Sequence, residues 1–201
     1  MPNTLEISMK IGKILGLAEA TKSILEYNTK YVEDTPMNVS MGHLRENMEE
    51  IINSIKKKIS EINWKPDLIV ASYHGIPKKY FDKGDPYHCY CMKTTRLLKE
   101  KFKSIDIMTT FQSRFGPQEW LTPYTDKTLE EIPKQGKKNI LVICPGFASD
   151  CVETLEEIAI QGKESFVDAG GENFDLIPCL NDNEDHINLL KNLVDSYLVK
   201  K

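Results

Sequence analysis

The sequence predicts an α/β fold: a parallel sheet of about four strands, flanked by helices on both faces. Two observations support this prediction. Apolar runs of strand length alternate with segments of helical periodicity at least four times in succession. Residues 139–144 (Asn-Ile-Leu-Val-Ile-Cys) are almost continuously apolar, which is typical of a strand buried on both faces of a parallel sheet.

The composition of the 201-residue chain restricts its class. Apolar residues make up 40% and charged residues 28%, as in soluble globular proteins. The net charge of −4 offers no basic surface for nucleic acid. No apolar run approaches the ~18 residues of a membrane span, and the first 16 residues lack the layout of a signal peptide. We therefore expect a cytoplasmic protein whose five cysteines are free thiols or metal ligands.

Two parts of the chain differ in how clearly they predict structure. Residues 1–34 show weak helical spacing with no strand before it, and a turn at 33–36 separates them from residues 35–201. In the second part we expect strands at 67–72, 105–111, 139–144 and 174–180 and helices at about 44–62, 92–102, 125–132, 150–169 and 184–198. The last helix is expected to bury Ile187, Leu190, Val194 and Leu198.

Three connections are expected to meet at one edge of the sheet. The loops after residues 72 and 111 are much longer than the ~2–6 residues usual in α/β units. Both leave the carboxyl ends of strands, as does the turn after Cys144. Ligand sites of open α/β sheets lie at this edge, and His74 directly follows the first strand.

A run of acids begins the helix after the strand at 139–144. Glu153 and Glu157 are four residues apart, so they share one helix face. Asp150 and Glu153 also fit a capping box, which would give these two acids a purely structural role. If the shared face turns toward the sheet edge, its carboxylates oppose His74. A histidine facing carboxylates can accept protons or hold a divalent metal.

Two other features have competing interpretations. Trp120 lies in a loop rich in Gly and Pro, where it either covers a small core under the loop or forms a flat apolar wall for a flat ligand. Cys89 and Cys91 flank one residue beside His88. Together with His88 they provide only three metal donors, and their spacing does not suit zinc. We therefore interpret the two cysteines as thiols of a polar loop.

Four motifs, in order, resemble those of proteobacterial ferrochelatases: S-Y-H-G-I-P at 72–77, G-D-P-Y at 84–87, T-F-Q-S-R-F-G-P-Q-E-W-L-T-P-Y-T-D at 110–126 and C-P-G-F-A-S-D-C-V-E-T-L-E-E-I at 144–158. That family has two similar α/β domains with a porphyrin cleft between them. The resemblance identifies residues 35–201 as the C-terminal domain and residues 1–34 as a helical remnant of the first. If the cleft is to be complete, we therefore expect another chain to supply most of the first domain.

The resemblance implies insertion of Fe²⁺ into protoporphyrin IX to give protohaem, the last step of haem biosynthesis, by a lyase of the metal chelatase type. It assigns the catalytic and metal roles to His74 and Glu153, and the acidic path to Asp150 and Glu157. It places the porphyrin cleft at Ser72, Tyr73, Pro77 and Trp120. His74 is either the proton acceptor or a metal ligand. The family's helix at Glu153 is often widened locally to a π-turn.

The resemblance also sets the expected cofactors and partners. No resident cofactor is expected, because Fe²⁺ is a substrate. A 2Fe-2S cluster, which some members carry, is not expected, because Cys89, Cys91 and Cys151 are three donors and four are usual. The expected partners are protoporphyrin IX, ferrous iron, a chain supplying the first domain and, for a poorly soluble product, the inner membrane surface as a peripheral contact.

Two alternatives remain open at this point. The first is a non-catalytic porphyrin- or haem-binding half-protein, which the missing first domain motivates. The second is another tetrapyrrole chelatase, such as one inserting cobalt into sirohydrochlorin. The Q-S-R-F-G and W-L-T-P-Y-T-D segments argue against the second.

Overall fold

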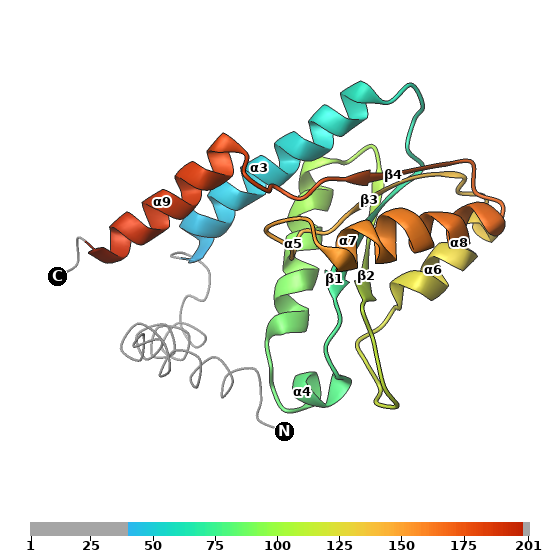
Figure 1. Ribbon diagram of the computed structural model, residues 1–201, viewed down its shortest axis with the longest axis horizontal. Coiled ribbons are helices and arrows are strands. Elements are labelled where there is room, and N and C mark those ends of the chain that lie inside the picture. Colours follow the sequence, from blue (N-terminus) through green and yellow to red (C-terminus); the bar gives the residue numbers. More distant parts are fainter. Residues whose placement is uncertain (1–39, 199–201) are drawn as a thin grey trace. The chain divides into compact units, whose positions relative to one another are not determined.

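The computed structural model describes residues 40–198 (Figure 1). The chain divides into two compact units, Met1–Glu46 and Asn47–Lys201, and the fold described below is that of the second. The helices expected within residues 1–34, and the boundary expected after residue 34, lie outside the described residues.

The second unit is built on a parallel sheet, as predicted. Its four strands are β1 (Leu68–His74), β2 (Asp106–Gln112), β3 (Asn139–Ile143) and β4 (Asn173–Ile177), in the order β2-β1-β3-β4. The chain leaves β1 toward β2 on one side and leaves β3 toward β4 on the other. The connections after β1 and β3 therefore diverge, and a crevice opens at the carboxyl ends of these two strands.

Helices cover both faces of this sheet, which confirms the predicted α/β class (Figure 1). Side chains alternate between the faces along each strand, so Ile69 and Ala71 enter one core while Leu68 and Val70 enter the other. The first core is closed by α3 (Ser40–Glu61) and α5 (Tyr87–Lys101). The second is closed by α6 (Thr125–Glu131), the π-helical segment η2 (Glu157–Gly162) and α8 (Lys163–Asp168). The short helix α7 (Val152–Leu155) precedes η2. The connections also contain α4 (Lys78–Asp82) and the 3₁₀ turn η1 (Pro133–Gln135), and α9 (Glu184–Leu198) ends the described chain.

The loop after β1 contains more helix than its sequence suggested. Helix α5 begins at Tyr87 rather than near residue 92, because the Asp85 carboxylate accepts the Tyr87 backbone N–H at 2.9 Å. The side chains of Cys89 and Cys91 therefore lie on a helix, and the prediction of a polar loop up to residue 90 is wrong.

The face that α9 buries also differs from the prediction. Ile187, Leu190 and Val194 are exposed, whereas His186 and Leu189 are buried. The apolar residues of α9 have helical spacing, but this spacing does not determine which face of the helix is buried. The His186 ring Nδ1 lies 2.7 Å from the Asn181 carbonyl oxygen, which holds His186 inward at the helix start. The side chain of Leu198 lies outside the described part of the chain.

Candidate active site

His74 is the last residue of β1, at the edge of the crevice between β1 and β3. Its ring Nδ1 lies 2.7 Å from the Gly75 carbonyl oxygen. A carbonyl oxygen can only accept, so Nδ1 carries the proton in the neutral ring and Nε2 keeps its lone pair. The Tyr87 hydroxyl donates to the His74 carbonyl at 2.8 Å, which anchors the backbone. Half-buried His74 therefore presents a basic nitrogen that can accept a proton or bind a metal.

Glu153 provides the opposing carboxylate, from the single turn of α7. Its pKa is held below the ordinary value, chiefly by a hydrogen bond from the Cys151 thiol, then by its own backbone N–H and by the nearby charge of His74. The interaction with His74 means that the two side chains lie within electrostatic reach across the crevice. Glu153 is consequently ionised near neutral pH.

Glu157 begins the π-helical segment η2 and is tied to the loop after β2. Its carboxylate accepts the Ser113 backbone N–H at 2.6 Å and the Ser113 hydroxyl at 2.5 Å. Ser113 adopts a left-handed backbone with φ of 63°. Few residues other than glycine adopt this conformation readily, so the paired hydrogen bonds are the compensation that stabilises it.

Asp150 does not take the position expected of it. Its carboxylate accepts the Asn181 side-chain amide at 2.7 Å, the Cys179 backbone N–H at 3.2 Å and the Thr154 hydroxyl at 3.2 Å. Burial acts to raise the pKa of Asp150, but these hydrogen bonds outweigh it and hold that pKa below its ordinary value. Asp150 thus ties the start of α7 to the loop after β4.

The predicted capping box of Asp150 with Glu153 is wrong. The residue that precedes α7 is Cys151, and its backbone N–H donates to the Thr154 hydroxyl at 2.9 Å. The box has the expected spacing but starts one residue later. The sequence could not indicate this, because the acids at 150 and 153 match the pattern better than a cysteine and a threonine do.

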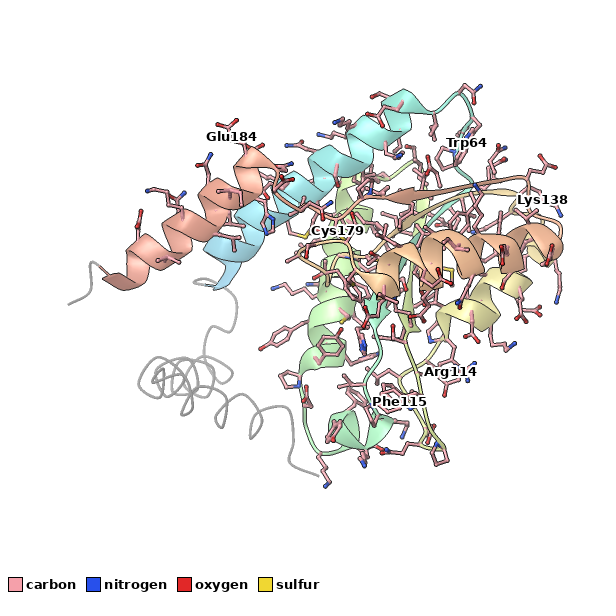
Figure 2. All side chains as sticks on the ribbon, viewed as in Figure 1. Trp64, Arg114, Phe115, Lys138, Cys179 and Glu184 are labelled. Atoms are coloured by element: carbon pink, nitrogen blue, oxygen red, sulfur yellow. The ribbon has the colours of Figure 1, made fainter. Side chains whose placement is uncertain are left out.

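A cavity of about 690 Å³ lies beside Glu153, between the loop after β2, α6 and the α7–η2 segment. Its acidic wall consists of Glu153, Glu156 and Glu157. Facing residues include Phe111, Phe115, Trp120 and Leu129, with Arg114 and Asp126 paired at 2.6 Å. Arg114 and Phe115 lie at the opposite end of the second unit from Trp64 and Lys138 (Figure 2).

Trp120 agrees with both interpretations of its loop. It is only 5% exposed, its indole N–H donates to the Phe115 carbonyl at 3.0 Å, and it packs on Gly75, where a Cβ would lie 3.2 Å from its ring. It therefore forms a small core under the loop, yet it also lines the cavity. Phe115, 75% exposed, packs on it with ring centroids 5.2 Å apart.

Two residues assigned to the porphyrin cleft are buried. Ser72 is 0% exposed and bonds to Gln112, and Tyr73 is 3% exposed with its hydroxyl 3.0 Å from that of Thr95. Neither side chain lines the cavity, nor do those of His74 and Pro77, so the assignment of Ser72 and Tyr73 to the porphyrin cleft stays a prediction. Pro77 is half-buried and forms an isolated antiparallel bridge with Trp120.

The metal-binding groups are few. Within residues 40–198, no three His, Cys, Asp or Glu side chains are grouped so that they could hold a metal ion. The roles of His74 and Glu153 as metal ligands stay a prediction. Cys89 is exposed while Cys91 is buried, and burial raises the pKa of the Cys91 thiol to about 12. The expected absence of an iron–sulfur cluster stays a prediction.

Sequence reasoning missed two polar residues that organise the site, Gln112 and Asn181. Gln112 ends β2 and is 2% exposed, and Asn181 holds Asp150 from the loop after β4. A glutamine closing an otherwise buried strand was the available signal for the first. Nothing in the Leu-Asn-Asp-Asn stretch distinguished the second from an ordinary turn.

Fold and site together define the class: a parallel α/β domain that presents a histidine and a carboxylate at the switch point of its sheet. The sequence model of the ferrochelatase family matches residues 41–198, so the chain belongs to the ferrochelatase family.

Curated relatives agree with this assignment. The chain is 56% identical over 149 residues to the ferrochelatase of Allorhizobium ampelinum, an alignment covering 73% of this chain and 43% of the relative. It is 54% identical over 149 residues to that of Rhizobium etli, covering the same shares, and 49% identical over 158 residues to that of Francisella tularensis, covering 77% and 47%. The chain thus spans less than half the length of these relatives. No helix among residues 40–198 is long and apolar enough to cross a membrane.

Proposed function

We propose that this chain supplies one wall of a ferrochelatase active site, which inserts Fe²⁺ into protoporphyrin IX to form protohaem. The remaining part of the relatives' length, carried by a partner chain, supplies the other wall. The observation that carries the proposal is that His74, whose Nε2 keeps a lone pair, ends β1 at the switch point with the ionised Glu153 within electrostatic reach. We assign the reaction to the cytoplasm, at the inner membrane surface, because its product is poorly soluble.

The chemistry needs a base beside an anion. A porphyrin loses two pyrrole protons as the metal enters, and neutral His74 can accept a proton through Nε2. The Glu153 carboxylate stabilises the imidazolium that forms. The same pair can instead hold Fe²⁺ before its transfer, since imidazole and carboxylate both bind divalent iron. Both roles require the His74 ring and the Glu153 carboxylate to lie close to each other.

We propose an acidic path that is shorter than the one the sequence suggested. Glu153 and Glu157 both line the cavity, whereas Asp150 is engaged with Asn181 and the loop after β4. We propose that protons or iron pass between His74 and solvent along the Glu153–Glu157 wall. Trp120 and Phe115 provide the apolar side of the cavity, suited to a flat ring.

The test mixes this chain with a separately expressed N-terminal half of one of its relatives and follows metal insertion by loss of porphyrin fluorescence. We expect turnover in the mixture and a loss of at least ~100-fold with His74→Ala, the usual contribution of an acid–base group. His88→Ala is the matched control, since that half-buried histidine packs between Phe81 and Phe111. Equal rates for wild type and His74→Ala would overturn the assignment.

The second candidate is a non-catalytic porphyrin- or haem-binding half-protein. Porphyrin binding by the mixture without any metal insertion would support it. Turnover that depends on His74 would exclude it.

A further inference from the structure

The buried carboxamide of Gln112 links the two sides of the crevice. On one side its Oε1 accepts the Ser72 hydroxyl at 2.7 Å and lies 3.5 Å from the Cys144 thiol, at the ends of β1 and β3. On the other side its Nε2 donates to the Glu153 carbonyl oxygen at 2.5 Å. A buried amide has a high cost if left unpaired, and Gln112 uses both ends.

The Glu153 carbonyl lies where the helix changes its hydrogen-bonding pattern. The α-type bonds of α7 reach Glu156 N to Val152 O at 2.9 Å, and the π-type bonds begin with Gln161 N to Glu156 O at 3.0 Å. The carbonyl of Glu153 lies between these two ladders. Carbonyls at such a discontinuity need partners from outside the helix, and the Gln112 amide is that partner here.

We propose that Gln112 is a positioning residue, which fixes the backbone of Glu153 relative to β1 and thereby sets the separation between Glu153 and His74. Ser72 lies two residues before His74 and points to the same face of the sheet. One planar amide therefore spans from the strand that carries the base to the helical turn that carries the acid. The kinetic part of this proposal rests on the proposed function, and the structural part does not.

Hydrogen exchange of the full chain, followed by mass spectrometry, tests the structural part. Gln112→Glu keeps the shape and the acceptor for Ser72 but removes the donor to Glu153. We expect amides in residues 153–160 to exchange about tenfold faster, while those of β1 and β3 keep their protection. Ser72→Ala keeps the donor to Glu153 and removes only the hydrogen bond that ties Gln112 to β1, so it should accelerate the same amides by a smaller factor.

A second variant guards against misfolding from the new acid. Gln112→Met has similar length without polar atoms, and it should accelerate the same amides by a similar factor. Wild-type exchange of residues 153–160 in both Gln112 variants would overturn the proposal.

The reconstituted mixture adds a kinetic readout. Gln112→Met should lower kcat for metal insertion about tenfold with little change in the KM for porphyrin, because the acid–base pair is displaced while the apolar side of the cavity, with Trp120 and Phe115, remains. A fall in porphyrin affinity alone would contradict a positioning role. If the wild-type mixture shows no turnover, the proposed function fails, and the exchange experiment still decides the role of Gln112.

Discussion

Asp150 and the Glu153–Glu157 wall are neighbours in one acidic run, yet the structure uses them differently. Asp150 accepts hydrogen bonds from Asn181, Cys179 and Thr154 and is absent from the cavity lining. Glu153 lines the cavity, and its pKa is lowered chiefly by local hydrogen bonds. Asp150 therefore stabilises the start of the helix, whereas the carboxylate of Glu153 is available to the cavity.

The difference follows from where the helix begins. The residue between them, Cys151, has extended backbone with φ of −149° and ψ of −175°. A spacing of three or four residues places side chains on one face only inside a helix, so Asp150 does not share the face of Glu153 and Glu157. An acidic run in a sequence is therefore not yet an acidic path.

The largest expected effect tests the structural role of Asp150 through the free energy of unfolding. Asp150→Ala should lower the free energy of unfolding by about 2 kcal/mol, because part-buried donors on three residues each lose a hydrogen bond to its carboxylate. Urea unfolding measures this. Asp182→Ala, an exposed neighbour, should change the free energy by less than about 0.5 kcal/mol. An Asp150 variant as stable as that control would remove the structural role.

A smaller effect is expected from the backbone conformation of Asn181, in the loop that holds Asp150. Asn181 has a left-handed backbone with φ of 50°. Asn181→Gly loses the side-chain bonds to Asp150, and Asn181→Ala loses the same bonds and adds backbone strain. The alanine variant should be about 1 kcal/mol less stable than the glycine variant in urea unfolding. If the two are equally stable, backbone conformation contributes nothing at this position.

The smallest expected effect concerns pH. The pKa of Asp150 is lowered in the folded chain, so its stabilisation is complete above the ordinary value of 3.8 and is lost as pH falls through the folded pKa. The difference in unfolding free energy between wild type and Asp150→Asn should be constant from about pH 7 to 5 and shrink below about pH 4. A difference that widens toward acid would mean that the shift has the opposite sign.

Helices and strands with strong apolar patterns could be predicted from the sequence. The burial of several individual side chains could not. The four strands and α3 follow from apolar runs and spacing, as the burial of Met48, Ile51 and Ile55 confirms. The burial of Ser72 and Tyr73 was missed, because a motif that surrounds a site residue does not say which of its members point into the core. The rotation of α9 was missed because the hydrogen bond of His186, and not the apolar stripe, sets it.

The sequence by itself determined the parallel α/β fold, the edge at which His74 lies and the shared face of Glu153 and Glu157, since local periodicity and chain order are enough for these. Only the tertiary structure decided that Asp150 is structural, that Gln112 joins β1 to the helix of Glu153 and that Trp120 is buried under its loop. Each depends on hydrogen bonds or packing between residues 29 or more positions apart, or on the conformation of one loop, and no local pattern encodes these.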